Sequence, residues 1–192
     1  MSNSNNRKLV FTYNAPVTLT FALASLIVLG VGKLTNGYST NMFFSVYRSP
    51  ISVAWFIRLF GHVLGHSNMT HLAGNMTLFL LLGPVLEDRY SSGTLLEAFG
   101  IVAVISGLVN IIFFPGTALL GASGLVFMMI VLVSAADLKK GEIPISMILV
   151  ILIYLGSEVW TMITVKDNIS QITHIIGGVS GAVIGGLLNS RK

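Results

Sequence analysis

Long apolar runs separated by short polar stretches dominate this chain. A helix that crosses the hydrocarbon core of a bilayer needs about 20 mostly apolar residues. Six runs reach or approach this length, over residues 15–35, 70–87, 94–114, 118–136, 143–163 and 170–189. No long-period repeat and no linker between domains is visible. The pattern predicts one all-α membrane domain of six transmembrane helices behind a polar tail at residues 1–14.

The longest stretch between these runs is the loop at residues 36–69. It is rich in aromatic and aliphatic residues, yet Arg48, Pro50 and Arg58 interrupt it. A segment that is apolar but carries charges fits the boundary between lipid and water better than the bilayer centre. We therefore expect this first loop to lie in the membrane interface.

Composition supports a membrane location and excludes several classes of function. Hydrophobic residues make up 54% of the 192 residues and charged residues only 9%, whereas a soluble domain is roughly a quarter charged. The net charge of +4 is spread in ones and twos, which argues against a nucleic-acid interface with clustered basic residues. Because the chain has no cysteine, disulfides and thiolate chemistry are excluded.

The basic residues indicate how the predicted helices are oriented. Six helices with an internal amino terminus place seven basic residues on the cytosolic side and four on the outer side, an excess that the positive-inside tendency favours. We therefore expect a multi-pass protein of the inner (cell) membrane with both termini in the cytosol. The seven are Arg7, Lys8, Arg89, Lys139, Lys140, Arg191 and Lys192, and the four are Lys33, Arg48, Arg58 and Lys166.

The fourth run contains the sequence Gly121-Ala122-Ser123-Gly124. If regular helix begins at Ser123 and ends near Ala136, it is about 21 Å long, shorter than the hydrocarbon core of roughly 30 Å. The preceding loop must then enter the membrane, where irregular backbone survives only inside protein or beside a water-filled cavity. This predicts a hydrated pocket at Ser123, although the glycines alone are also compatible with simple close packing of helices.

Polar groups from three helices are expected at a similar depth near the outer surface. Ionisable residues within membrane spans are candidates for functional sites. In the predicted topology Ser123 lies near the outer end of the fourth helix. The second and sixth helices contribute His71, Asn75 and His174 at the same end.

These residue types fit acyl transfer. A serine needs an adjacent base to become a good nucleophile, and the neutral imidazole of His174 is suited to take its proton. His71, Asn75 and the backbone N–H of Ser123 are candidate donors to the oxyanion of the tetrahedral intermediate. The clearest acid within the spans is Glu158, which fits an interface position. We therefore predict a Ser-His dyad whose histidine is oriented by packing.

His62 and His66 are also four residues apart and so share a helix face. That spacing can bind zinc, but a third ligand and a carboxylate base are missing nearby. We expect these two side chains to brace the first loop through hydrogen bonds to the backbone. Neither a metal nor a cofactor is predicted.

Together these residues resemble the rhomboid family of intramembrane serine proteases. The match extends over about residues 55–186 in the family's order and spacing. It rests on His62-x-x-x-His66-x-x-x-x-His71-x-x-x-Asn75, on Gly121-Ala122-Ser123-Gly124, on His174-x-x-Gly177-x-x-x-Gly181, on Glu87-x-Arg89, and on Arg58 in the first loop.

The resemblance implies a six-helix bundle with a membrane-associated first loop and a catalytic Ser123–His174 pair. It also implies that His71, Asn75 and Gly121 support the oxyanion, and that the substrates are transmembrane proteins cut near the outer end of a helix. Structural roles are implied for His62, His66, Arg58, Glu87, Arg89, Gly177 and Gly181.

Two positions depart from the family pattern. Ile57 replaces the tryptophan of the first-loop Trp-Arg pair, and Phe127 replaces a tyrosine four residues after the serine. A phenylalanine keeps an aromatic face on which His174 can stack, so we expect activity to survive. The alternatives are a catalytically inactive rhomboid-like binding or quality-control protein, and a small transporter that uses the histidines as an ion path.

Overall fold

The fold is built from helices that run between two ends of a bundle. The structure is a computed structural model that describes residues 12–135, 145–150, 152–153, 156 and 169–189. Within these ranges the elements are helical, apart from an isolated bridge between Val46 and Leu119. The predicted all-α class is confirmed for the residues described.

Among the residues that the structure describes, four helices are long and apolar enough to cross a membrane. A total of six spans stays a prediction, since α6 is shorter and most of residues 143–163 lie outside the described ranges. The four are α1 (Pro16–Leu34), α4 (Met69–Tyr90), α5 (Ser92–Phe113) and α9 (Ile169–Asn189).

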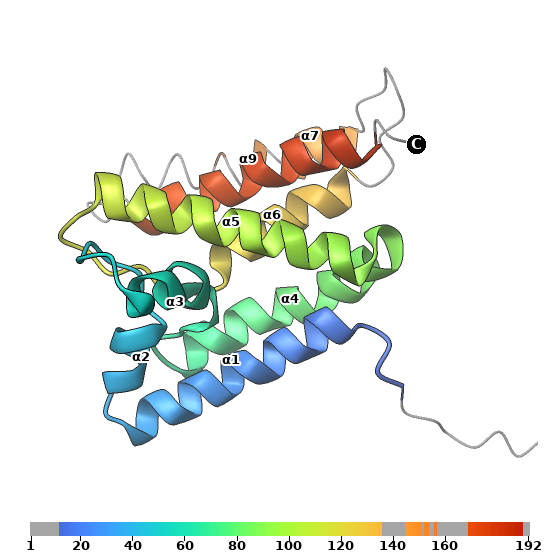
Figure 1. The fold of residues 1–192 in the computed structure, drawn as a ribbon. Coiled ribbons are helices and arrows are strands. Elements are labelled where there is room, and N and C mark those ends of the chain that lie inside the picture. Colours follow the sequence, from blue (N-terminus) through green and yellow to red (C-terminus); the bar gives the residue numbers. More distant parts are fainter. Residues whose placement is uncertain (1–11, 136–144, 151, 154–155, 157–168, 190–192) are drawn as a thin grey trace, which may run out of the picture.

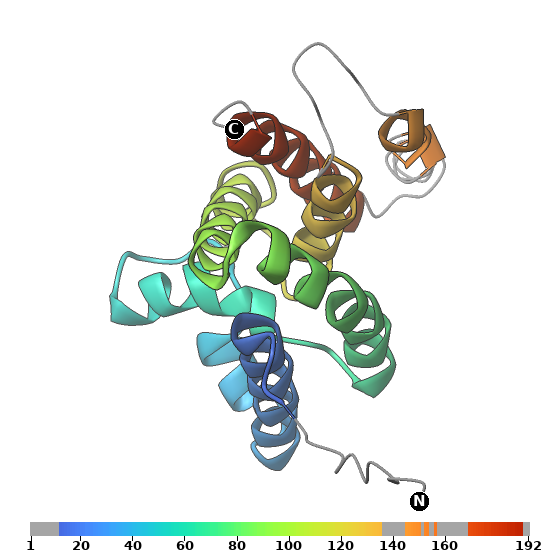
Figure 2. The ribbon, with the colours of Figure 1, turned by 90° about the vertical axis from the view of Figure 1, so that its right-hand side faces the viewer.

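The helices divide into two groups around α5 (Figures 1 and 2). α1 packs against α4 on one side, and α6 (Ser123–Ser134) packs against α9 on the other. The turn between α4 and α5 lies at one end of the bundle, on the right in Figure 1. The opposite end carries the first loop and the segment that leads into α6.

The helix bounds add detail to two predicted ranges. The first loop, residues 36–69, contains three short helices: α2 (Tyr38–Phe43), α3 (Val53–Gly61) and the 3-10 turn η1 (His62–Leu64). Within the predicted range 118–136, α6 covers only Ser123–Ser134, so regular helix begins at Ser123 as predicted. Its 12 residues extend about 18 Å. Of the predicted fifth span at residues 143–163, the structure describes α7 (Ile145–Val150) and residues 152, 153 and 156, and the other residues of this range lie outside the described part.

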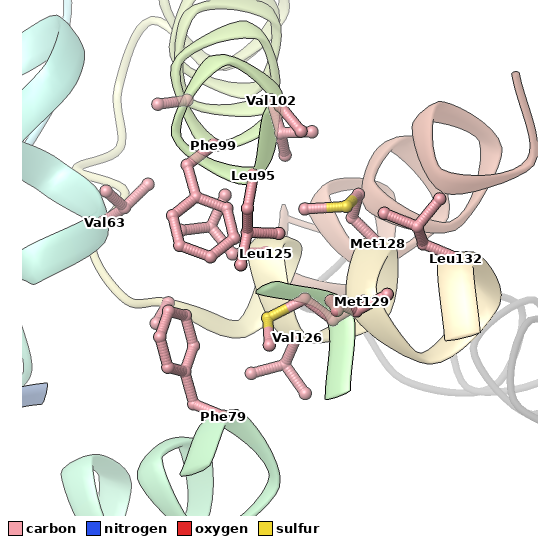
Figure 3. Packing of buried hydrophobic residues seen from close by; sticks show 14 of the residues in the cluster. Val63, Phe79, Leu95, Phe99, Val102, Leu125, Val126, Met128, Met129 and Leu132 are labelled. Carbon is pink, nitrogen blue, oxygen red and sulfur yellow. The ribbon is translucent and has the colours of Figure 1, made fainter. Parts of the chain in front are cut away.

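The hydrophobic core lies where α4, α5 and α6 meet (Figure 3). Phe79 of α4 and Phe99 of α5 have ring centres 5.2 Å apart, and both side chains are almost fully buried. Leu125 and Met129 of α6 extend into the same cluster. This packing fixes α6 against two spanning helices, so the position of its first residue is set by the bundle.

The carboxylate of Glu87 joins α4 to the start of α1. The N-cap residue of α1, Ala15, has no side chain able to accept hydrogen bonds from the helix N-terminus. Glu87 accepts the backbone N–H groups of Val17 at 3.1 Å and Thr18 at 2.6 Å, and the hydroxyl of Ser92 at 2.7 Å. A carboxylate is favoured there by the unpaired N–H groups and by the helix dipole. Glu87 therefore caps a helix 70 residues away in the sequence.

We expect Glu87→Gln to lower the free energy of unfolding by about 1.5–3 kcal/mol, because hydrogen bonds to a charged acceptor are lost. The measurement is equilibrium unfolding in mixed micelles with increasing SDS. Asp88→Asn is the matched control, since Asp88 is the adjacent acid and its side chain is exposed. Equal stability of the two variants would contradict the capping role.

Candidate functional site

The loop before Ser123 is held in place by the first loop. Val46 and Leu119 exchange two backbone hydrogen bonds of 2.9 Å, and the N–H of Gly121 donates to the carbonyl of His62 at 2.9 Å. The buried amide of Asn110 donates to the carbonyl oxygens of Val46 at 3.1 Å and of Thr117 at 3.3 Å. The backbone N–H and C=O groups of this irregular segment therefore find hydrogen-bond partners within the protein. Such partners are required where irregular backbone lies within the membrane.

Ser123 is the first residue of α6 and is half-buried. The N-cap residue, Ala122, provides no side-chain hydrogen bond. The first N–H groups of a helix have no partner within the helix and carry the positive end of its dipole. The hydroxyl of Ser123 thus lies beside backbone donors suited to an anionic oxygen.

Gly121 brings this loop against α4. Its φ of +127° belongs to a region that favours glycine. A methyl group at this position would lie 2.9 Å from Nε2 of His71 and 3.9 Å from Nδ2 of Asn75. Only a glycine allows the backbone before Ser123 to approach these two side chains so closely.

The amide of Asn75 is oriented by His66. Burial lowers the pKa of His66 to about 4, so its ring is neutral near pH 7. The ring Nδ1–H donates to the carbonyl of Leu64 at 3.1 Å, which leaves Nε2 to accept the amide of Asn75 at 3.1 Å. The rings of His66 and His71 meet edge to face with centres 5.0 Å apart. The first loop therefore positions both predicted oxyanion donors.

His62 has a structural environment. It is buried, and burial lowers its pKa to about 4. Its Nδ1 lies 3.1 Å from the carbonyl oxygen of Leu59, and its Nε2 lies 3.3 Å from the hydroxyl of Ser106 on α5. The side chain ties the first loop to α5, while its carbonyl holds Gly121.

Glycines bring α9 into backbone contact with α6. A methyl group at Gly177 would overlap the carbonyl oxygen of Gly124, and one at Gly181 would overlap that of Met128. A methyl group at Gly124 would lie 3.0 Å from the side chain of Thr173. Small residues at a helix interface allow this approach in membranes. The residue after Thr173 is consequently held next to the start of α6.

The side chain of His174 lies on the face of α6 that carries Ser123. Its ring stacks on Phe127 with ring centres 4.3 Å apart and an angle of 5° between the planes. Ser123 and Phe127 are four residues apart, so they share one helix face. His174 is also close enough to His71 to interact with it electrostatically. Side chains of α4, α6 and α9 therefore converge at one end of the bundle.

Other predicted residues lie away from this convergence. Arg58 is buried in the first loop, where it donates to the hydroxyls of Tyr47 at 3.1 Å and Ser49 at 2.5 Å. Glu87 and Arg89 lie near the other end of α4, about 24 Å and about 27 Å along the helix from His71. Among the residues described, no three His, Asp or Glu side chains gather to hold a metal ion.

Three polar residues near the site, Ser67, Asn68 and Asn110, were not predicted from the sequence. Asn68 is the N-cap of α4 and accepts the backbone N–H of His71 at 2.8 Å. A polar Ser-Asn pair just before an apolar run is a recognisable helix start, so this cap was detectable. Asn110 gave no comparable signal, because its partners are backbone groups far away in the sequence.

Comparison with known families gives an independent assignment. Residues 53–191, well over half of the chain, match the Rhomboid domain. A search of curated proteins found no match. The matched region contains the first-loop histidines, the loop at Gly121 and the glycine contacts between α6 and α9. The family match and the apolar helices establish an integral membrane protein, and the chain belongs to the rhomboid family.

Proposed function

We propose that this chain is an intramembrane serine endopeptidase that cleaves transmembrane protein substrates without a metal or cofactor. The observation that supports the proposal is that side chains from three helices converge at the end of the bundle where α6 begins with Ser123. The ring of His174 stacks on Phe127, one turn after Ser123 on the same face of α6. His71 and Asn75 of α4 lie close to the backbone of Gly121. Membership of the rhomboid family supports the same chemistry.

In the proposed acylation step, Oγ of Ser123 attacks the carbonyl carbon of the scissile peptide bond. His174 takes the hydroxyl proton as general base and then donates it to the leaving amine. The stacked ring of Phe127 fixes the plane of the imidazole, which supports orientation by packing. Water then hydrolyses the acyl-enzyme by the same route, with His174 again acting as the base.

The negative oxygen of each tetrahedral intermediate requires hydrogen-bond donors on the side of Ser123 opposite His174. Nε2–H of His71, the amide of Asn75 and the first N–H groups of α6 are the candidates. In serine hydrolases the loss of one such donor costs about 3–4 kcal/mol of barrier. The approach of Gly121 to His71 and Asn75 supports their participation.

The proposed site also suits a substrate that arrives from the bilayer. The site residues His71, Ser123 and His174 lie near the amino ends of α4, α6 and α9. These helix ends lie at the end of the bundle opposite the α4–α5 turn (Figure 1). With both termini in the cytosol, this end faces the outer side of the inner membrane. We therefore propose cleavage near the outer end of a substrate helix.

A fluorophosphonate probe tests the proposal, because it reacts only with an activated serine. We expect the purified protein in detergent micelles to be labelled at Ser123, and Ser123→Ala to remain unlabelled. Ser134→Ala is the control, since Ser134 lies on the same helix and donates only to the carbonyl of Ile130 in the described structure. Folded parent protein that fails to label, while a known serine protease labels, would instead favour a catalytically inactive relative.

A further inference from the structure

A short polar network precedes α4 on the side of His71 that faces away from Gly121. The hydroxyl oxygen of Ser67 lies 3.2 Å from Nδ1 of His71, and the amide of Asn68 donates to the same oxygen at 3.3 Å. The side-chain oxygen of Asn68 accepts the backbone N–H of His71 at 2.8 Å. Nδ1 and the backbone N–H of His71 therefore both contact the residues that precede α4.

The orientation of Asn68 limits how the hydrogens in this network can be placed. A backbone N–H is always a donor, so the atom of Asn68 that faces it is the oxygen and the other atom is the NH₂ group. The NH₂ group donates to one lone pair of the Ser67 oxygen, and the Ser67 hydroxyl hydrogen remains available to Nδ1 of His71 at 3.2 Å. When this hydrogen is directed at Nδ1, Nδ1 is the acceptor, and a neutral imidazole carries its single hydrogen on the other nitrogen, Nε2.

This tautomer matches the geometry at Gly121. Nε2 is the ring atom closest to that glycine, at 2.9 Å from the position of an added methyl carbon. A hydrogen on Nε2 can donate to an oxyanion beside Gly121, whereas the opposite tautomer would present a lone pair and repel it. His66 has the reverse arrangement, with its hydrogen on Nδ1 and its Nε2 accepting from Asn75.

We propose that Ser67 is a positioning residue that holds His71 in the Nε2–H tautomer and aims this hydrogen at the oxyanion. The inference rests on the proposed protease function for its kinetic consequence. The tautomer itself is independent of that function. Ser67 does not touch the reacting atoms and acts through His71.

The tautomer is measured directly by ¹⁵N NMR of protein labelled at its four histidines. Nε2 of His71 is expected to show the shift of a protonated nitrogen and Nδ1 that of an unprotonated acceptor, with assignment from His71→Gln. In Ser67→Ala we expect a mixture of both tautomers, and in Ser67→Thr the parent spectrum. A hydrogen on Nδ1 in the parent, or no change in Ser67→Ala, would overturn the proposal.

The kinetic arm uses cleavage of a transmembrane substrate. Ser67→Ala should lower kcat about fivefold with KM unchanged, as expected for one hydrogen bond of about 1 kcal/mol. Ser67→Thr should restore kcat. Thr70→Ala, an exposed hydroxyl just inside α4, should leave it unchanged. A normal kcat in Ser67→Ala despite a mixed tautomer would refute positioning, while absence of cleavage in the parent refutes only the protease function.

Discussion

Ser123→Ala is expected to reduce cleavage of a transmembrane substrate by a factor on the order of 10⁴ to 10⁶. The alanine removes the nucleophilic oxygen but keeps the helix start, the loop contacts of Gly121 and the stacking of Phe127 on His174. Residual acceleration would come only from oxyanion donors and binding. The measurement is kcat/KM for a model substrate in liposomes, with the parent protein and the variant purified identically.

Ser134→Ala provides the matched control for this loss. It removes a hydroxyl from the last turn of the same helix, so its cleavage rate should stay within a factor of two of the parent. Both variants should unfold at the same SDS fraction as the parent. Cleavage by pure Ser123→Ala at the parent rate would show that the nucleophile is elsewhere.

Gly121→Ala is expected to lower kcat by about 10² to 10³. The methyl group would lie 2.9 Å from Nε2 and 3.0 Å from Cε1 of His71, so the ring must move from its position as a donor. Removal of one oxyanion donor has an effect of this size. The φ of +127° also strains an alanine by about 1–3 kcal/mol. Because the donors act in the transition state, KM should change little.

Gly116→Ala separates this local effect from a general effect on the loop. Gly116 lies in the same segment, its φ is not in the left-handed region, and an added methyl group meets no atom within 4 Å. We expect this control to keep the parent kcat and stability. Equal activity of Gly121→Ala and the parent would exclude His71 as a donor in the position described.

Some conclusions could be reached from the chain alone because they depend on local pattern. The length of the apolar runs predicts membrane helices, and four of them are present as continuous helices in the described structure. The glycines around Ser123 predict a helix that starts late, and α6 starts at that residue. Aromatic character at position 127 predicts a stacking surface, and His174 stacks there.

Other features depend on partners that are distant in sequence. From the sequence, Glu87 would be placed only at the end of its own helix. In the structure it caps α1 by accepting the N–H groups of Val17 and Thr18, which lie 70 and 69 residues away in the sequence. Asn110 reads as an ordinary polar residue within a span, yet it holds the loop before Ser123. Sequence spacing cannot reveal such contacts, because a hydrogen bond requires both partners to reach the same place.

The sequence by itself determined that lipid surrounds the helices, in which order the motifs occur and which chemical groups the candidate site contains. Each of these follows from composition and local periodicity. The tertiary structure decided which groups meet: the backbone at Gly121 with His71 and Asn75, Phe127 with His174, and Ser67 with Nδ1 of His71. The physical reason is that distances of about 3–4 Å between helices are set by side-chain packing across the bundle. That packing is a property of all the helices together.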